Sequence, residues 1–402
     1  MSRHVRFRVL LFLVLALPVL ALVSTAASAQ MQWSSQDGKT TVKFGFLVQP
    51  QAEWLETSDT NHYSQNLFLR RMRLMFGGNI NENWSFFIET DSPKLGYAKT
   101  DGTKTGDFYI QDAVVTYSHG DPFKVDMGMI LVPMSHNTTQ SAASLLPVDY
   151  GPYTFLASDA TASKVGRDYG LQFRGYLFDK HFEYRAGIFQ GFRGKEVKDT
   201  AGTVTQYAGV QPFRYTLRAV WYPFEADTGL FYAGTTLGTK KILAVGTSYD
   251  RQSDYKTWDL DVFYDQPFKN GDGLTLQADW MKYDGGDFFA VPVYTPPAPD
   301  LAAATWECGA QCLAKRDALL VEAGYYFKAI KFGPFAQYAS ESFDSKYDSY
   351  PIYGQKKYTL GAAYWGNGHK FNVKVAAAKI LSGEPGVADH YQYTLQAQIF
   401  TY

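Results

Sequence analysis

TVKFGFLVQPQAEW, residues 41–54, alternates apolar and polar side chains along its length. The alternation assigns the residues to two faces, an apolar face of Val42, Phe44, Phe46, Val48, Ala52 and Trp54 and a more polar face of Lys43, Gly45, Gln49, Gln51 and Glu53. A period of two predicts a β-strand. Strands of soluble proteins average about 5–6 residues, whereas a tilted strand that crosses a bilayer needs roughly 9–11. The stretch therefore predicts a membrane-spanning strand.

The same alternation recurs along the rest of the chain. It predicts further strands at residues 66–76, 84–91, 108–118, 123–131, 168–178, 181–190, 213–222, 240–250, 257–264, 274–283, 317–327, 331–340, 356–364, 369–379 and 390–402. With residues 41–54 the count is about 16, an even number that suits a single-chain bacterial barrel. Short links rich in Gly, Asn, Asp and Pro alternate with long links, and in outer-membrane barrels the short turns are periplasmic. We expect an all-β, transmembrane antiparallel barrel over residues 41–402.

The first residues read as a targeting segment. Arg3, Arg6 and Arg8 precede the apolar run 9–23, and Ala27-Ser28-Ala29 is a small-residue cleavage site. The run is shorter than the roughly 20 apolar residues of a spanning helix. We expect a signal peptide at residues 1–29, a short periplasmic segment at residues 30–40, and export to the bacterial outer membrane.

Composition supports a barrel with a polar interior. Phe, Tyr and Trp make up 16% of the chain, yet the mean hydropathy is −0.24. Lys and Arg number 38 against 39 Asp and Glu, so removing the three N-terminal Arg leaves about −4 (35 against 39). That balance gives no reason to expect a nucleic-acid partner. An aromatic-rich but on average polar chain fits a soluble β-protein or a membrane barrel with a polar lumen, and the strand lengths favour the barrel.

Residues 132–167, VPMSHNTTQSAASLLPVDYGPYTFLASDATASKVGR, interrupt the alternation. The segment has no sustained period and is rich in Ser, Thr, Pro and small residues. So long an insertion is normally functional or disordered. We interpret it as a loop that folds into the lumen and narrows it. The candidate constriction residues are His136, Asp149, Tyr150, Tyr153, Asp159 and Lys164; the alternative is that most of them pack the loop against the wall.

Charged side chains on the polar faces suggest what the pore prefers. The candidate basic pore-lining residues are Lys43, Arg71, Arg73, Lys124, Arg174, Arg185, Arg214, Arg218 and Lys374. Rings of Arg and Lys favour anions, and the guanidinium fork suits phosphate or carboxylate. Acids of similar number share those faces, namely Glu53, Glu89, Asp91, Asp112, Asp126, Glu183, Asp259, Asp261, Asp279 and Glu322. A transverse field in a general diffusion pore would explain the same charges.

Residues 66–87, NLFLRRMRLMFGGNINENWSFF, resemble the signature near the start of the phosphate-selective porins O and P. The likeness continues more loosely through FYIQDAVVTY (108–117), VDMGMILVPMS (125–135) and VGRDYGLQFRGYL (165–177). The resemblance implies a sixteen-stranded trimeric porin whose third long loop, here 132–167, folds inward. Arg70, Arg71 and Arg73 fall in the motif, but the family's full arginine ladder and central lysine cannot be traced. In a regular strand only one of Arg70 and Arg71 can face the lumen; Arg70 would otherwise snorkel or sit at a trimer contact.

Two features near the end of the chain complete the picture. Cys308 and Cys312 lie in a Pro-rich link, and in an oxidising compartment we expect them to form a disulfide rather than a metal site. Phe400 and Tyr402 resemble the terminal aromatic pair of outer-membrane strands, yet they have opposite parity to Leu395 and Ile399. Either a bulge shifts the face near Ile399 or the terminal pair does not face lipid.

No catalytic motif, metal site or cofactor site is apparent in the sequence. We expect a passive, non-enzymatic diffusion channel for small hydrophilic solutes that prefers anions and selects for phosphate or polyphosphate. The expected assembly is a homotrimer surrounded by outer-membrane lipids and lipopolysaccharide. The rival hypotheses are an outer-membrane barrel hydrolase and a structural or adhesive barrel, and conduction of ions by the purified protein separates them from a porin.

Overall fold

The structure is a computed structural model that describes residues 31–57, 62–99, 101–158, 161, 163, 165–206, 208–286, 288, 313–345 and 352–402. The predicted signal peptide, the loop candidates Asp159 and Lys164, and the predicted Cys308–Cys312 pair lie outside the described residues. Those assignments stay predictions, as does the periplasmic placement of residues 30–40. Within the described part of the chain, no helix is long and apolar enough to span a membrane.

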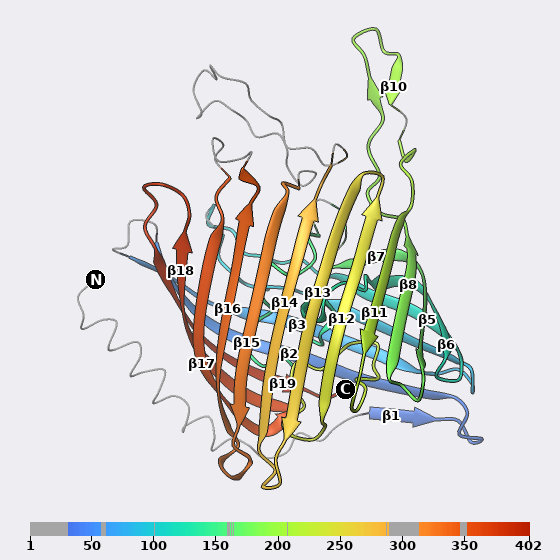
Figure 1. Ribbon diagram of the computed structural model, residues 1–402, viewed down its shortest axis with the longest axis vertical. Coiled ribbons are helices and arrows are strands. Elements are labelled where there is room, and N and C mark those ends of the chain that lie inside the picture. The colour runs from blue at the N-terminus through green and yellow to red at the C-terminus, as the bar shows by residue number, and fades with distance from the viewer. Residues whose placement is uncertain are drawn as a thin grey trace.

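The fold is a closed antiparallel barrel of sixteen strands (Figure 1). The strands are β2 (Thr41–Glu56), β3 (Tyr63–Asn79), β4 (Trp84–Asp91), β5 (Tyr109–His119), β6 (Phe123–Leu131), β7 (Arg167–Leu177), β8 (Phe182–Phe189), β11 (Arg214–Trp221), β12 (Ile242–Gln252), β13 (Tyr255–Pro267), β14 (Gly273–Asp284), β15 (Arg316–Tyr326), β16 (Phe332–Phe343), β17 (Gln355–His369), β18 (Phe371–Ser382) and β19 (His390–Phe400). Each pairs with the next, β8 pairs with β11, and β19 closes the ring on β2. The predicted fold class and strand count are confirmed.

Alternation along each strand separates a buried polar face from an exposed apolar face. On β13, Asp259 and Asp261 are buried, whereas Trp258, Leu260 and Val262 are exposed. Elsewhere on the outer wall, Leu67 is 81% exposed and Leu360 is 68% exposed. In a closed barrel the buried polar face is the inner one. The exposed apolar face is the one that meets lipid in a membrane barrel.

Short elements lie at the two rims. The strand β1 (Met31–Ser34) pairs with residues 41–44 of β2, and β19 pairs with the later residues 47–55 of the same strand. On the rim of long links, β9 (Val197–Lys198) and β10 (Val204–Gln206) pair in a projection beyond the barrel (Figure 1). A single 3-10 turn, η2 (Lys328–Ile330), joins β15 to β16 at the rim of short turns.

The end of the chain turns its aromatic pair inward. The register between β19 and β2 is the same at Gln392, which lies opposite Leu55, and at Phe400, which lies opposite Leu47. No bulge therefore shifts the face between them. Ile399 is exposed on the outer wall, whereas Phe400 and Tyr402 pack against buried residues inside the barrel. Of the two alternatives left by the sequence, the terminal pair that does not face lipid is the one observed.

Candidate pore constriction

The segment between β6 and β7 is held against the inner face of the barrel by hydrogen bonds from several strands. It contains one turn of helix, α2 (His136–Thr139), capped by the side chain of Ser135. The backbone N–H of Asn137 donates to Oδ1 of Asp279 on β14 at 2.9 Å. Further along the segment, Nε2 of Gln398 on β19 donates to the carbonyl of Ala143 at 2.8 Å. Lys374 on β18 donates to the carbonyls of Leu145 and Pro147.

A β-bulge on β3 brings two adjacent arginines to the same carboxylate of this segment. Met72 pairs with Val48 and Leu69 pairs with Pro50, so Arg70 and Arg71 together oppose the single residue Gln49. A bulge of this kind re-aims side chains. Arg70 Nε lies 2.6 Å from Oδ2 of Asp149, and Arg71 Nη2 lies 2.7 Å from its Oδ1. Both guanidiniums therefore face inward, which corrects the expectation that only one of the two can.

Two cations and one carboxylate leave a positive surplus here. Burial by itself would raise the pKa of the Asp149 carboxyl, but the Arg70 and Arg71 guanidiniums outweigh it and hold that pKa well below its usual range. Asp149 is therefore ionised at neutral pH. The cluster carries two positive charges and one negative charge.

These residues line a cavity of about 540 Å³. Its charged lining consists of Arg70, Arg71, Arg73, Arg167, Lys357, Asp91 and Asp149. Arg73 pairs with Glu89 at 2.8 Å and with Asp91 at 3.0 Å, and Arg167 pairs with Asp112 at 3.1 Å. Lys357 donates to the amide oxygen of Gln392 and forms no ion pair with any described residue. Counting the partners Glu89 and Asp112, five cations face four carboxylates, so the surplus is one positive charge.

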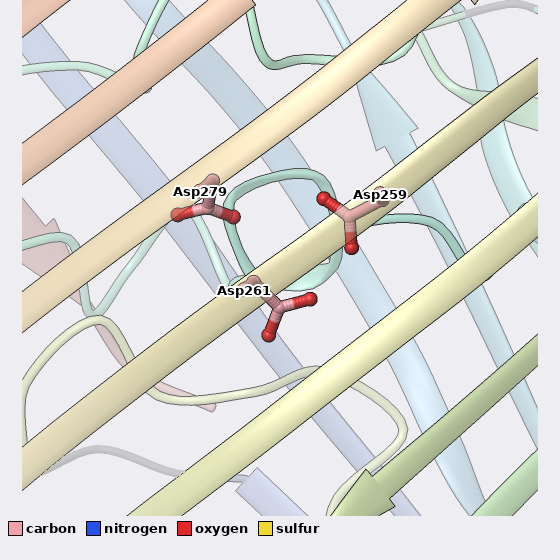
Figure 2. A group of neighbouring side chains, drawn as sticks. All are labelled: Asp259, Asp261 and Asp279. Carbon is pink, nitrogen blue, oxygen red and sulfur yellow. The ribbon is translucent and has the colours of Figure 1, made fainter.

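The wall formed by β13 and β14 is acidic. Asp259 and Asp261 on β13 and Asp279 on β14 point toward one another, with one carboxylate oxygen of each within 4.8 Å of the others (Figure 2). Arg218 on β11 lies 2.6 Å from Asp261 and 3.4 Å from Asp259. One guanidinium thus serves two carboxylates, while Asp279 accepts bonds from Asn137 and Gln277. None of these three carboxylates lines the basic cavity.

Most of the remaining predicted basic residues lie inside the barrel and have partners of their own. Arg174 pairs with Asp126 at 2.6 Å, Arg185 with Glu183 at 2.7 Å, and Arg214 with Asp250 at 2.5 Å. Lys124 is partly exposed and lies 3.9 Å from Asp121, and Lys43 is half-buried. Lys374 holds the segment rather than a carboxylate. Of all nine predicted basic residues, only Arg71 and Arg73 line the basic cavity.

The loop candidates divide between cavity and packing. Asp149 and Tyr150 line the basic cavity, and the Tyr150 hydroxyl donates to the carbonyl of Gln140 at 2.8 Å. His136 is buried, with its ring stacked 4.2 Å from that of Phe263 and its Nε2 3.0 Å from the carbonyl of Ala233. Burial lowers the pKa of His136 to about 4, so the imidazole is neutral at pH 7. Tyr153 donates to the amide oxygen of Gln355 on β17.

A second inward segment, residues 222–241 between β11 and β12, enters from the rim of short turns. Tyr232 donates its N–H to the carbonyl of Thr139 at 3.0 Å and accepts from the N–H of Ser141 at 2.8 Å, so the two segments meet. Its ring contacts Arg185 and Arg218. Sequence analysis did not single out this segment. Its length, far beyond that of the other turns on this rim, is the signal that could have found it.

A closed barrel with an apolar outer wall, a charged interior and inward segments is an outer-membrane pore. The model of the family described as phosphate-selective porin O and P matches residues 43–282. The chain belongs to this family, as its motif at residues 66–87 suggested. Family and fold indicate the bacterial outer membrane and a channel rather than an enzyme.

Solved structures share the fold at low sequence identity. OmpF of Salmonella typhi, in a complex with daunomycin, is 13% identical over 92% of this chain and 100% of that chain, with a TM-score of 0.58. An anion-selective porin from Comamonas acidovorans is 13% identical over 90% and 100%, with a TM-score of 0.55. The outer membrane channel DcaP of Acinetobacter baumannii is 12% identical over 92% and 99%, with a TM-score of 0.54. No match was found among curated protein sequences.

Proposed function

We propose that this porin is a passive diffusion channel that prefers small anions, inorganic phosphate among them, and that the segment between β6 and β7 sets its narrowest part. The observation that carries the proposal is the sharing of one carboxylate, Asp149, by Arg70 and Arg71. A surplus cation beside the path attracts anions, and planar guanidiniums suit phosphate or carboxylate oxygens. The anion-selective porin from Comamonas acidovorans shares the fold of this chain.

The other candidate residues enter the proposal through their charge. Arg174, Arg185, Arg214 and Arg218 each have a carboxylate partner, so they contribute to the field across the lumen more than to direct anion binding. Lys357, half-buried and without an ion pair among the described residues, joins the anion path. We also propose that the protein is exported by residues 1–29 and assembles as a homotrimer in the outer membrane.

A general diffusion pore is the second candidate, and the acidic wall of Asp259, Asp261 and Asp279 favours it. Opposed basic and acidic walls create a transverse field without selecting one solute. The two candidates differ in net selectivity. Only an anion-preferring pore has a zero-current potential of the anion sign.

The test is the zero-current potential of the purified protein in a planar bilayer under a KCl gradient, followed by addition of phosphate. We expect anion selectivity and a current that phosphate reduces. The double variant Arg70→Gln, Arg71→Gln should move the potential toward cation selectivity, while Arg251→Gln on the exposed side of β12 should not. A wild-type potential of zero or of cation sign would overturn the anion preference.

A further inference from the structure

A second cavity adjoins the basic one and has the opposite character. Its volume is about 280 Å³, and most of its lining is apolar, with the charged residues Arg73, Glu89 and Arg174 among the rest. The apolar lining comes from four strands, both inward segments and the end of the chain. Its residues are Leu47 on β2, Met75 on β3, Phe86 and Phe87 on β4, Val114 on β5, Ala143 of the first inward segment, Leu230 and Phe231 of the second, and Phe400 and Tyr402 at the end of the chain. Arg73 is part of the lining of both cavities, so the two lie next to each other.

Three aromatic rings in this cavity pack against one another. Phe87 packs edge to face against Tyr402, with centroids 5.6 Å apart, and against Phe231, with centroids 5.9 Å apart. Edge-to-face and offset contacts at such distances are favourable for aromatic pairs. Phe87, Phe231 and Tyr402 are also half-buried rather than buried, so part of each remains accessible to a solute.

The apolar part of this lining gives no advantage to inorganic phosphate or chloride. A fully hydrated ion gains nothing from apolar walls and loses part of its hydration beside them. An organic solute with an apolar body gains from removing that body from water, in proportion to the area buried. The cavity therefore discriminates among anions by their body rather than by their charge.

Inward side chains of β3 lead from the basic cavity to the aromatic one. Arg71, Arg73 and Met75 project inward at alternate positions, and a strand rises about 3.3 Å per residue, so neighbouring inward side chains lie roughly 6.6 Å apart. Arg73 has carboxylate partners of its own, so the surplus charge of Arg70, Arg71 and Lys357 is what draws a carboxylate into the basic cavity. A ring that lies beyond Arg73 then reaches Met75 and Phe87. The cavities, of about 280 Å³ and about 540 Å³, have room for a monocyclic carboxylate.

We infer that the two cavities form one amphipathic site for small organic anions, in which the basic cavity takes a carboxylate and the aromatic cavity takes an apolar or aromatic body. The inference rests on the proposed anion preference and adds a substrate class to it. Phe231, which lies in the second inward segment and lines the aromatic cavity, is the residue that selects for the apolar body. Arg73, which lines both cavities, lies between the carboxylate and the apolar body of the bound solute.

The test compares benzoate, acetate and benzamide as blockers of KCl current through the full-length protein in planar bilayers. Acetate has the charge without the ring, and benzamide has the ring without the charge. We expect benzoate to block at a concentration at least tenfold below that of either. Phe231→Ala should bring the benzoate value close to the acetate value, while Phe224→Ala, in the same segment but outside the cavity, should not.

The outcomes separate this inference from the proposed function. An anion-selective channel in which benzoate and acetate block equally would overturn the amphipathic site and leave the anion preference in place. Equal block by benzoate and benzamide would overturn the role of the carboxylate. A channel without anion selectivity overturns the proposed function, and the zero-current potential of the untreated protein reports that result before any blocker is added.

Discussion

Arg71 on the barrel wall and Asp149 on the inward segment are joined by a contact of 2.7 Å between Nη2 and Oδ1. The contact attaches the segment to β3. The same carboxylate also neutralises part of the positive charge of Arg70 and Arg71. Attachment and selectivity therefore depend on the same carboxylate. A change at Asp149 alters the charge of the path and the hold on the segment together.

Asp149→Asn should increase anion preference. The substitution removes the carboxylate shared by Arg70 and Arg71, so the charge of that cluster rises from one to two positive charges. The zero-current potential under a KCl gradient should move further in the anion direction. Asp101→Asn, on an exposed link away from the cavity, is the matched control and should leave the potential unchanged. A shift toward cations would show that Asp149 does not face the permeation path.

Lys374→Met should loosen the inward segment. Lys374 donates to the carbonyls of Leu145 and Pro147, and its loss leaves two acceptors without their charged donor, at a cost of about 1–3 kcal/mol for each buried group. We expect larger and noisier single-channel conductance, measured in planar bilayers. Lys379→Met, on the same strand but exposed, serves as the control. Identical conductance traces for both variants would argue against a role for Lys374 in holding the segment.

Acidification should destabilise the protein through His136. Its folded pKa of about 4 lies below the ordinary value of 6.5, so between these values the unfolded chain binds a proton that the folded chain does not, and stability falls as the pH falls. At pH 5 the effect of this one group is about 2 kcal/mol. The measurement is thermal unfolding in detergent at pH 7.5 and pH 5.

The control for that experiment is His136→Gln, which keeps an N–H donor but does not titrate. Its midpoint should fall less than that of the wild type between the two pH values. The charged residues nearest His136 are Asp261 and Arg218, which are present in both proteins, so the difference between the variants isolates the imidazole. Equal pH dependence would mean that His136 is not buried as the structure describes.

Strand alternation predicted the barrel because it is a local property of each segment. The inward or outward direction of a side chain follows from parity alone, and sixteen segments gave sixteen strands. The parity rule failed at Arg70 and Arg71, because one extra residue on β3 opposite Gln49 changes the face and leaves no mark in the composition of the strand. The sequence also could not reveal which carboxylate serves which arginine. Arg218 and Asp261 are paired through strands whose neighbourhood is set only by the closed fold.

Two further features depend on contacts that periodicity does not encode. The inward turn of Tyr402 follows from the unbroken register between β19 and β2. The hydrogen bonds of Tyr232 with Thr139 and Ser141 join two irregular segments that are far apart in the chain. Neither segment has a periodic pattern from which this contact could be predicted. Residues of the site were thus predictable where strands carry them and unpredictable where loops do.

Deleting residues 139–161 should raise single-channel conductance, because this stretch carries the hydrogen bonds that hold the segment across the inner face. The bonds from Gln398 to Ala143 and from Lys374 to Pro147, and the ion pairs of Arg70 and Arg71 with Asp149, would all be lost. Loss of Asp149 leaves both arginines facing a wider path, so the anion preference per unit of current should fall because water screens the charges. Conductance should be measured on variant protein whose circular dichroism and heat-resistant migration match those of the wild type. Unchanged or smaller conductance in such a folded variant would place the narrowest part of the pore elsewhere, and the segment of residues 222–241, which approaches from the other rim, would be the next place to shorten.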